Sequence, residues 1–514
     1  MIKLKNKKEC TGCAACYNIC PTKCIEMEAD KEGFKYPFVD KGVCIKCGKC
    51  IGVCPQLKRQ KNTDEKHEVY VCVNNDNQDV ERSSSGGIFV LLARQILSAK
   101  GVVYGAAMDN DYQLKHTRVD NIDELEKLLK SKYIQSDIGF TYKYVKEDLT
   151  KNRNVLFCGT PCQISGLNNY LGKRYDNLLL VDFACHGVPS QKVFNEYLKC
   201  RNLNKCKHNY EISFRDKVNG WEEFGMSIRE NNKIIYSKDR REDTFLKVFL
   251  NDIALRESCY TCIYKKSERI SDITLADAWC INEYDANLYN SKGTSLIIIH
   301  TLNGEHTFAK IRNKMCINSV AEEYVIKYSY GMFHQPIKDR RRRKFYKQLG
   351  KKSFDKAFAL SNDENITRDM INEAFIRIIN NYDKVVTLNK FQMATYFVST
   401  INSVTIDYLR KTGREDLVEA DDYEKFLKKS VIEERKFCSL EDVSIRNYQL
   451  SQVIDAIDEL TDKEKLLLID KFYFEKSNRE IASTMDMKEN QVHVYVKRVC
   501  EKLCNIVDEN KKQK

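Results

Sequence analysis

The sequence lacks any long uninterrupted apolar run. Across its 514 residues no apolar stretch approaches the ~18 residues that a membrane-spanning helix needs, and SLIIIH at 295–300 is short enough to be a strand. The start of the chain, MIKLKNKKEC, is basic and polar and lacks the apolar segment of a secretory signal peptide. These absences predict a cytoplasmic protein with no membrane partner.

The sequence also lacks low-complexity segments, and its only internal repeat is a pair of cysteine motifs. Hydrophobic residues make up 42% of the chain and charged residues 31%, which is typical of a soluble globular protein. A chain of this length exceeds one ordinary domain, so we expect about three domains.

Cysteine, by contrast, is abundant. In a chain without an export signal, 22 cysteines favour metal ligation in a reducing cytoplasm over disulfides. Two runs near the start share the spacing C-x2-C-x2-C-x3-C-P, which is typical of ferredoxins with two 4Fe–4S clusters. The first run comprises Cys10, Cys13, Cys16 and Cys20, and the second comprises Cys44, Cys47, Cys50 and Cys54. Zinc and disulfides are the alternatives, and two complete copies with trailing prolines disfavour both.

The last cysteine of each run is expected to ligate the cluster of the other run. We therefore assign Cys54 to the cluster of the first run and Cys20 to the cluster of the second run. Cys24 is left over from this scheme, and we expect it to be a buried structural thiol.

The net charge of +12 is unevenly distributed, because the basic excess lies in residues 1–360 and the remainder of the chain is slightly acidic. A basic, cysteine-rich part favours an acidic protein or a phosphorylated cofactor over DNA as its partner. The run KDRRRRK at 338–344 is either a nucleic-acid patch or a solvated helix face, and we favour the helix face.

Residues 69–360 alternate short apolar runs with amphipathic stretches, which predicts an α/β domain with a largely parallel sheet. The expected strands are 69–73, 102–108, 154–158, 178–185 and 295–300, and the expected helices are 88–100 and 191–201. A polar linker separates this domain from the ferredoxin module of residues 1–58.

Further cysteines stand where two of these strands end, in NVLFCGTPCQ and LLLVDFACHGVPS. Because the carboxyl ends of parallel strands share one edge of a sheet, the two turns can converge. With a later C-x2-C pair they supply four thiolates for a third 4Fe–4S cluster, namely Cys162, Cys185, Cys259 and Cys262. A structural zinc site and unconnected buried cysteines are the alternatives, and Cys158 is a competing ligand.

A turn rich in serine and glycine precedes the helix expected at 88–100. Backbone N–H groups at a helix start bind anions, so this turn is a candidate site for a flavin or nucleotide phosphate, although an ordinary N-cap looks similar. The turn comprises Ser83, Ser84, Ser85, Gly86 and Gly87, and SKYIQSD adds Lys132, Tyr133, Gln135 and Ser136 as contacts. His186 is the candidate catalytic proton donor, and a structural strand-end histidine is the alternative.

Several of these motifs resemble the beta-subunit family of coenzyme F-420 hydrogenases and dehydrogenases: SSSGGIF, KYIQSDIG, FCGTPCQISGL, VDFACHGVPS, SFRDKVNGW and the C-x2-C pair before SDITLADAW. The resemblance spans about residues 1–360 and is strongest to bacterial members with an N-terminal two-cluster ferredoxin. It implies an FAD-dependent iron–sulfur oxidoreductase. Its partners would be ferredoxin or another redox protein and a small-molecule hydride acceptor or donor, such as a deazaflavin. Cys280 stands where the family has Gly and adds a candidate ligand.

From residue 361 onward the strand patterns disappear and helical periodicity takes over. Residues 440–508 contain a predicted helix-turn-helix. Its first helix would be packed by Ile481, Ala482 and Met485, and its second by Val492 and Val496. The exposed face of the second helix would present Asn490, Gln491, His493, Lys497 and Arg498 to DNA.

This segment resembles region 4 of sigma-70-type factors, and residues 361–411 resemble the later part of region 2, with 412–439 as the linker. The resemblance implies promoter DNA and core RNA polymerase as partners. There is no room for the helices that begin region 2 and dock on polymerase. In the turn, Asp486 and Lys488 replace the usual Gly and Ser. An unrelated helical bundle is the alternative.

The expected fold is therefore multidomain: a ferredoxin-like two-cluster α+β module, an α/β flavoprotein domain over 69–360, and an all-α C-terminal domain with a helix-turn-helix. The expected function is an oxidoreductase that moves electrons between 4Fe–4S clusters and a flavin. A redox-responsive sigma-like regulator and a fusion with a vestigial tail are the alternatives.

Overall fold

The computed structural model describes residues 1–3, 6–58, 68–203 and 210–362, and separate positions between 400 and 502. Residues 1–361 form one compact unit, and a second unit lies C-terminal to it in the sequence. The two units are described in turn. Within the described residues, no helix has both the length and the apolar character needed to cross a membrane.

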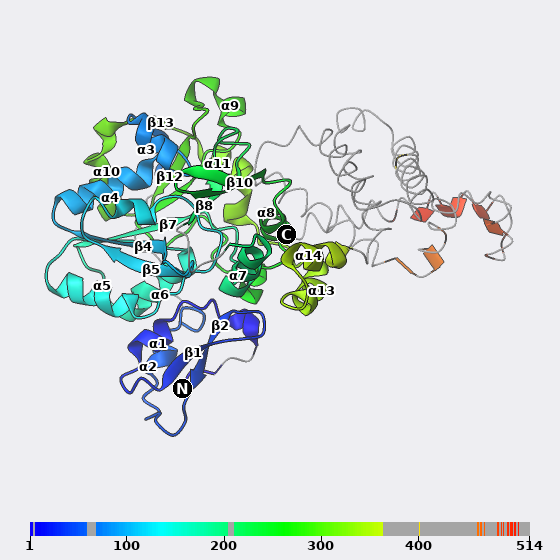
Figure 1. The fold of residues 1–514 in the computed structure, drawn as a ribbon, viewed down its shortest axis with the longest axis horizontal. Coiled ribbons are helices and arrows are strands. Elements are labelled where there is room, and N and C mark those ends of the chain that lie inside the picture. Colours follow the sequence, from blue (N-terminus) through cyan, green and yellow to red (C-terminus); the bar gives the residue numbers. More distant parts are fainter. Residues whose placement is uncertain are drawn as a thin grey trace. The chain divides into compact units, whose positions relative to one another are not determined.

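The first residues form a small module around a β-hairpin (Figure 1). Its strands are β1 (Ile25–Ala29) and β2 (Lys35–Val39), and its short helices are α1 (Ala15–Ile19) and α2 (Lys49–Gly52). Each helix begins after a left-handed residue that follows the second cysteine of a run, Ala14 with φ 58° and Gly48 with φ 76°. These two turns curl the cysteine loops back on themselves. Such loops are what three thiolates around one cluster require.

The main domain is built on an eight-stranded sheet in the order β13-β3-β12-β11-β7-β6-β4-β5. Its strands are β3 (Glu68–Asn74), β4 (Val102–Met108), β5 (Leu114–Val119), β6 (Val155–Cys158), β7 (Leu178–Phe183), β11 (Ile273–Asp277), β12 (Ser295–Ile299) and β13 (Met315–Ser319). Its α-helices are α3 (Asn77–Arg82), α4 (Ile88–Ser98), α5 (Thr141–Thr150), α6 (Pro161–Leu171), α9 (Ile281–Tyr284), α10 (Leu302–Ala309), α11 (Glu322–Tyr328) and α12 (Tyr330–Phe333).

Only the four central strands β11, β7, β6 and β4 are parallel, and every other pairing in the sheet is antiparallel. The expectation of a largely parallel sheet is therefore wrong at both edges. The parallel centre nevertheless brings the carboxyl ends of β6 and β7 together. Alternate residues cover its two faces: Val103 and Leu156 pack with α4, whereas Val102 and Phe157 pack with α5 and α6.

A smaller three-stranded sheet completes the unit, in the order β10-β9-β8. Its strands are β8 (Tyr210–Asp216), β9 (Gly225–Glu230) and β10 (Lys233–Asp239), and its helices are α7 (Gln191–Cys200), α8 (Thr244–Leu250), α13 (Arg341–Gln348) and α14 (Phe354–Asn362). Buried aromatic side chains from these elements and from the segment between β8 and β9 form one core, including Phe194, Tyr197, Phe214, Trp221, Phe245 and Phe354.

The five strands expected from apolar runs are confirmed as β3, β4, β6, β7 and β12, and the two expected helices as α4 and α7. The solvated helix face expected at 338–344 is corrected at Arg342. This side chain is buried, and it forms ion pairs with Glu32 of the N-terminal module and Glu257 of the main domain. A charge run in sequence does not reveal that one of its members faces inward.

In the C-terminal unit, the expected core residues Ile481, Ala482, Met485 and Val492 are buried in one cluster, and Val496 packs against it. Thr461 and Glu464 form a reciprocal cap, since Glu464 accepts from the Thr461 N–H (2.8 Å) and donates its own N–H to Thr461 Oγ1 (3.3 Å). The predicted sigma region 2, 361–411, and the linker, 412–439, fall almost wholly outside the described residues.

Candidate redox site

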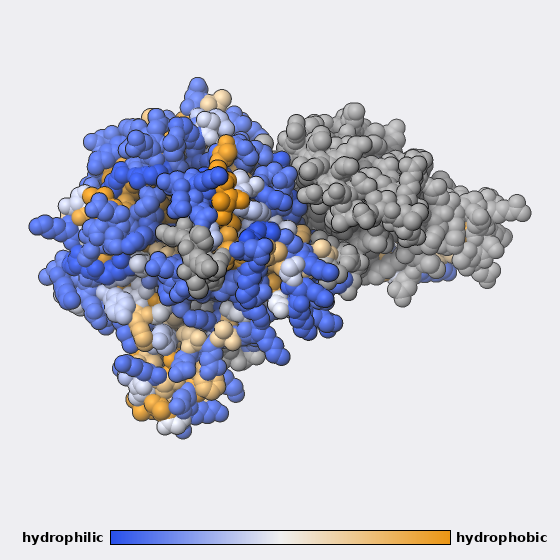
Figure 2. Space-filling view, in the orientation of Figure 1, coloured by the Kyte–Doolittle hydropathy of each residue, from blue (hydrophilic) through white to orange (hydrophobic). Residues whose placement is uncertain are grey.

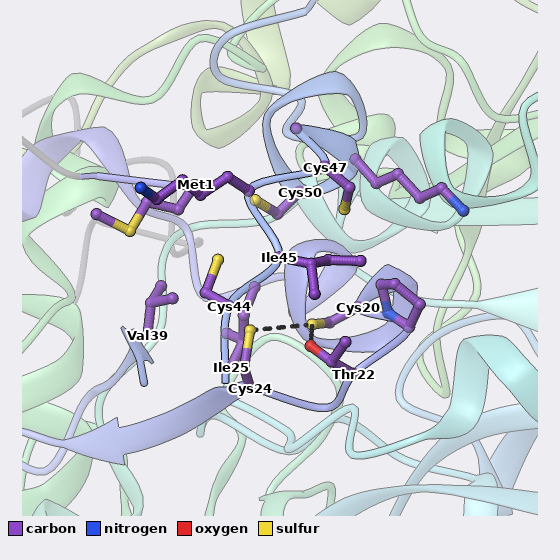
Figure 3. Close-up of a pocket in the computed structure, with 14 residues that line it drawn as sticks. Met1, Cys20, Thr22, Cys24, Ile25, Val39, Cys44, Ile45, Cys47 and Cys50 are labelled. Atoms are coloured by element: carbon purple, nitrogen blue, oxygen red, sulfur yellow. Dashed lines mark hydrogen bonds between the residues drawn. The ribbon is translucent and has the colours of Figure 1, made fainter. Parts of the chain in front are cut away.

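The N-terminal module holds its eight motif cysteines in two groups. Burial raises the pKa of Cys13 to about 12. A backbone hydrogen bond opposes this rise, and the nearby thiols of Cys10 and Cys54 add to it. Because Cys54 acts on Cys13, it lies close to the cysteines of the first run. Cys20 of the first run in turn lines a small cavity with Cys44, Cys47 and Cys50 (Figure 3). This crossing is the arrangement that two clusters with exchanged fourth ligands require.

Cys24 also lines this small cavity, and its Sγ lies 3.4 Å from Cys20 Sγ (Figure 3). The thiol is buried, as expected, but it faces the cavity and is not enclosed in the apolar core alone. Ile2 donates its backbone N–H to Cys50 Sγ at 3.1 Å, a contact that sequence spacing does not suggest.

A larger cavity of about 330 Å³ lies in the main domain, where the carboxyl ends of the central strands meet the serine–glycine turn. It is lined by all four cysteines expected to hold a third cluster, Cys162, Cys185, Cys259 and Cys262. It is also lined by eight of the nine expected flavin contacts, Ser83, Ser84, Ser85, Gly87, Lys132, Tyr133, Gln135 and Ser136. Its volume lies within the ~300–1,000 Å³ of typical ligand pockets.

The GTPCQ turn fixes Cys162 at the second position of α6. Thr160 and Gln163 form a capping box around Pro161, and Thr160 Oγ1 lies 3.1 Å from Cys162 Sγ. Burial raises the pKa of Cys185 to about 11 and that of Cys259 to about 12, so these thiols are neutral without a bound metal. Their deprotonation would be coupled to metal binding.

The cysteines of this cavity do not form a site for a single metal ion. Among the described residues, no three His, Cys, Asp or Glu side chains converge closely enough to hold one metal ion. A tetrahedral zinc site needs such convergence, whereas a 4Fe–4S cubane gives each thiolate its own iron and so spreads the sulfurs apart. Cys158 also lines the cavity, but Cys280 packs in the aromatic core and does not line it.

Hydrogen bonds to two other segments of the main domain hold the serine–glycine turn in place. Ser84 Oγ accepts from the N–H of Ser131 at 2.7 Å, and Ser85 Oγ donates to the carbonyl of Thr294 at 2.8 Å. Gly86 differs from the prediction: it does not line the cavity, and a Cβ there would stand 2.5 Å from the carbonyl oxygen of Cys72. Gly86 therefore serves the close packing of the turn on β3 and β12.

Lys132 and Tyr133, which follow Ser131, bring an amino group and an aromatic ring to the cavity wall. Burial lowers the pKa of Lys132 to about 7, and its Nζ donates to the carbonyl of Leu129 at 2.5 Å. Tyr133 stacks on Phe249 with ring centroids 4.5 Å apart. A cationic group and an aromatic ring in one wall fit a ligand that has both phosphate and a planar ring system.

Gln135 and Ser136 line the cavity but have protein partners. Gln135 Nε2 donates to the carbonyl of Thr11 in the N-terminal module at 2.9 Å. Ser136 Oγ lies 2.9 Å from His116 Nδ1 and accepts from Gln163 Nε2 at 3.0 Å. Burial lowers the pKa of His116 to about 4, so this histidine is a neutral structural group.

His186 also lines the cavity, and its Nε2 lies 2.7 Å from Asp252 Oδ1. Asp252 is buried and is held in turn by the backbone N–H of Ile337 at 2.9 Å. The role of His186 as proton donor stays a prediction.

Sequence reasoning missed several cavity residues, namely Arg215, Arg256, Tyr264, Lys265, Arg269, Asp277 and Trp279. Arg215 Nη1 donates to Asp277 Oδ2 at 2.5 Å, and its guanidinium lies over the Trp279 ring. Arg215 lies in the motif SFRDKVNGW, and Asp277 and Trp279 lie in SDITLADAW. Both motifs carried the family resemblance, which could have identified these residues as part of the site.

In the C-terminal unit, Gln491 and Arg498 are exposed on the second helix, as a DNA-reading face requires. Asn490, His493 and Lys497 lie outside the described residues. Lys502 Nζ pairs with Glu464 Oε2 at 2.7 Å, which joins this helix to the first capped turn.

Three segments of the chain match family models. Residues 152–323 match the C-terminal part of the beta subunit of coenzyme F-420 hydrogenase/dehydrogenase, residues 9–57 match the 4Fe–4S dicluster domain, and residues 450–503 match sigma-70, region 4. No curated protein matches the chain. A solved structure of the F-420-reducing NiFe hydrogenase complex from Methanosarcina barkeri is 15% identical, with a TM-score of 0.35. The alignment covers 59% of this chain and 94% of that chain.

Proposed function

We propose that this chain, which joins an iron–sulfur oxidoreductase of the coenzyme F-420 hydrogenase/dehydrogenase beta-subunit type to a sigma-70 region 4 segment, is an FAD- and 4Fe–4S-dependent oxidoreductase. One observation carries the proposal: four cysteines and a serine–glycine turn with a cationic side chain line the same cavity. A metal cluster and a flavin bound there would be neighbours.

The contact between the N-terminal module and α6 supports a third cluster in this cavity. Cys13 packs on Gly166, where an added Cβ would meet Cys13 Sγ at 3.1 Å. Gly166 lies one helical turn after Cys162. Burial raises the pKa of Tyr264, and the thiols of Cys162 and Cys13 raise it further. Tyr264 therefore lies near both the cysteines of the large cavity and those of the first run. The first cluster and the third would thus be close enough for electron exchange.

The flavin would be held by the turn Ser83–Gly87, with Lys132 supplying positive charge to its phosphates and Tyr133 an aromatic surface. A bound flavin supplies the exchange between single electrons and hydride. The small-molecule hydride acceptor or donor would enter the same cavity, and the family name suggests a deazaflavin.

The redox partner would dock at the outer end of the N-terminal module. Cys47 is exposed, and the exposed apolar residues Met1 and Ile45 line the same small cavity. Figure 2 shows apolar surface, in orange, on this module. Lys46 and Lys49 line the same cavity and are exposed. Because the loop 41–49 has three lysines and no acidic residue, it favours an acidic electron-transfer protein such as a ferredoxin.

Flavin release tests the proposal directly. Protein purified without oxygen and reconstituted with FAD should release about one flavin per chain when denatured. The matched variant Gly86→Ala should retain little, since its Cβ would displace the turn from β3. Denatured wild-type protein that releases no flavin would contradict the proposal, whatever its iron content.

DNA binding by the C-terminal unit is a separate proposal, supported by the sigma-70 region 4 match and by the buried core of the two helices. We propose that it binds a promoter −35-like duplex weakly and does not initiate transcription, because the chain has no room for the polymerase-docking helices of region 2. A run-off transcript made by core polymerase with this protein would contradict the second half.

A further inference from the structure

Arg256 lies where the N-terminal module meets the main domain. It precedes the short 3-10 helix Glu257–Thr261 that carries Cys259, and its side chain is only 1% exposed. The guanidinium points away from its own segment and into the loop of the first cysteine run. Arg256 is therefore close in sequence to Cys259 of the large cavity, and its side chain contacts Cys10 of the first cysteine run.

The guanidinium makes four polar contacts, three with the N-terminal module and one with Gln135 of the main domain. Nε donates to the carbonyl of Cys10 at 2.8 Å, and Nη2 lies 3.7 Å from Cys10 Sγ. Nη2 also donates to the carbonyl of Lys35 at 2.9 Å, and Nη1 donates to Gln135 Oε1 at 3.0 Å. The group lies over the Tyr36 ring, 4.3 Å from its centroid.

The loop of the first run is shaped to this side chain. Gly12 has φ 72°, and a Cβ there would stand 2.9 Å from Arg256 Nη1 and 2.8 Å from Gln135 Nε2. A larger residue at position 12 would push the guanidinium away from Cys10. The glycine thus serves both the left-handed turn and the close approach of the charge.

The charge of Arg256 has no carboxylate partner in the described part of the chain. Its neighbour Arg342 shows the contrast, because that buried guanidinium pairs with both Glu32 and Glu257. A buried charge without a counter-charge is costly. A cluster ligated by four thiolates is anionic, and in this position it would supply the missing negative charge.

We propose that Arg256 is a positioning residue that raises the reduction potential of the cluster held by Cys10, Cys13, Cys16 and Cys54. Adding one electron to that cluster adds one negative charge. A cation and an N–H donor at the Cys10 sulfur stabilise the reduced form more than the oxidised form, and cluster potentials respond to both effects. The inference rests on the proposed function, because it needs the cluster to be present.

The test is a redox titration of the full-length iron-loaded protein, followed by electron paramagnetic resonance. Arg256→Gln removes the charge, and Arg256→Lys keeps a charge but cannot make the forked contacts to Cys10. Arg342→Gln is the matched control, since it removes a buried guanidinium from the same interface without touching a cysteine. Iron content is measured for each protein.

One cluster signal should shift to a more negative potential in Arg256→Gln by about 59 mV or more, a tenfold change in the ratio of reduced to oxidised cluster. Arg256→Lys should shift the same signal in the same direction by less, and Arg342→Gln should leave it unchanged. Should Arg256→Gln fail to load iron, the Arg256→Lys shift decides the question.

Wild-type potentials in whichever Arg256 variants load iron would overturn the inference, as would an equal shift in Arg342→Gln. These outcomes differ from failure of the proposed function itself. If the chain bound no clusters, the wild-type protein would show no cluster signal at all, and if it lacked only the flavin, the cluster signals and the shift in Arg256→Gln would remain.

Discussion

At the scale of single residues, burial decides the chemistry around the cavity. It raises the pKa values of the cavity thiols, lowers the pKa of His116 to about 4, and lowers the pKa of Lys132 to about 7. The thiols need a metal to ionise, whereas Lys132 is poised to take up a proton when an anion binds beside it.

Flavin affinity should therefore depend on pH through Lys132. Below a pH of about 7 the free ammonium is already charged, and above it anion binding must take up a proton. We expect the affinity to be constant on the acidic side and to fall roughly tenfold between about pH 7 and 8.5. Fluorescence titration with FAD measures it. Lys132→Met should bind more weakly and without this pH dependence, whereas the exposed control Lys127→Met should behave as wild type. A flat wild-type profile would show that Lys132 does not face the phosphates.

At the scale of elements, α6 joins the cavity to the N-terminal module. Its first turn carries Cys162, and its second turn carries Gly166 against Cys13. Helix propensity favours alanine over glycine by about 1 kcal/mol. Packing opposes it here, because a Cβ at position 166 would lie 3.0 Å from both Cys13 Cβ and the Tyr142 hydroxyl.

Gly166→Ala should consequently lower the free energy of unfolding by about 1–3 kcal/mol, the usual cost of overpacking. Gly52→Ala is the control, since that helical glycine has open space around its added Cβ. Denaturant unfolding of both variants measures the difference. A Gly166→Ala protein more stable than wild type would mean that the module does not rest on α6 in this way.

The sequence predicts well those features that depend on the spacing of residues within one short segment. The cysteine runs, the GTPCQ turn and the central strands β4, β6 and β7 follow from local pattern, because each element needs only its own residues, whereas the fourth central strand, β11, was not predicted. The antiparallel edge formed by β13, β3 and β12 did not follow, since β3 pairs with strands from the far end of the domain. Arg256 was also missed, because a single arginine has no periodicity and its partners are distant in the chain.

At the scale of the whole molecule, the uneven charge predicts how partners approach. Lys46 and Lys49 lie beside the exposed Cys47, and electrostatic steering raises association rates by ~10–10³. Reduction of the protein by an acidic ferredoxin should slow as salt increases. Lys46→Glu combined with Lys49→Glu should slow it at least tenfold at low salt.

Stopped-flow absorbance measures this rate. The matched control is Lys310→Glu combined with Lys314→Glu, which changes the net charge equally at exposed positions of the main domain. Equal slowing by both double variants would indicate a global charge effect and no docking face at Cys47.

The C-terminal unit makes an independent prediction. Arg498 is exposed on the second helix, and losing one bidentate base contact costs roughly 1–3 kcal/mol. Arg498→Ala should therefore weaken binding of a −35-like duplex about tenfold or more in a gel-shift assay and leave flavin reduction unchanged. Lys463→Ala removes an exposed charge from the helix that precedes the helix-turn-helix and should have a smaller effect. Equal losses in the two variants would argue for phosphate contact without base recognition.

Iron and acid-labile sulfide, measured per chain on protein purified without oxygen, test the central claim most directly. Three cubanes of four iron atoms give about 12 iron per chain. Cys259→Ser should reduce this to about eight, whereas Cys280→Ser, at a buried cysteine outside the cavity, should keep about 12. About eight iron in the wild type, unchanged by Cys259→Ser, would contradict a third cluster in the cavity.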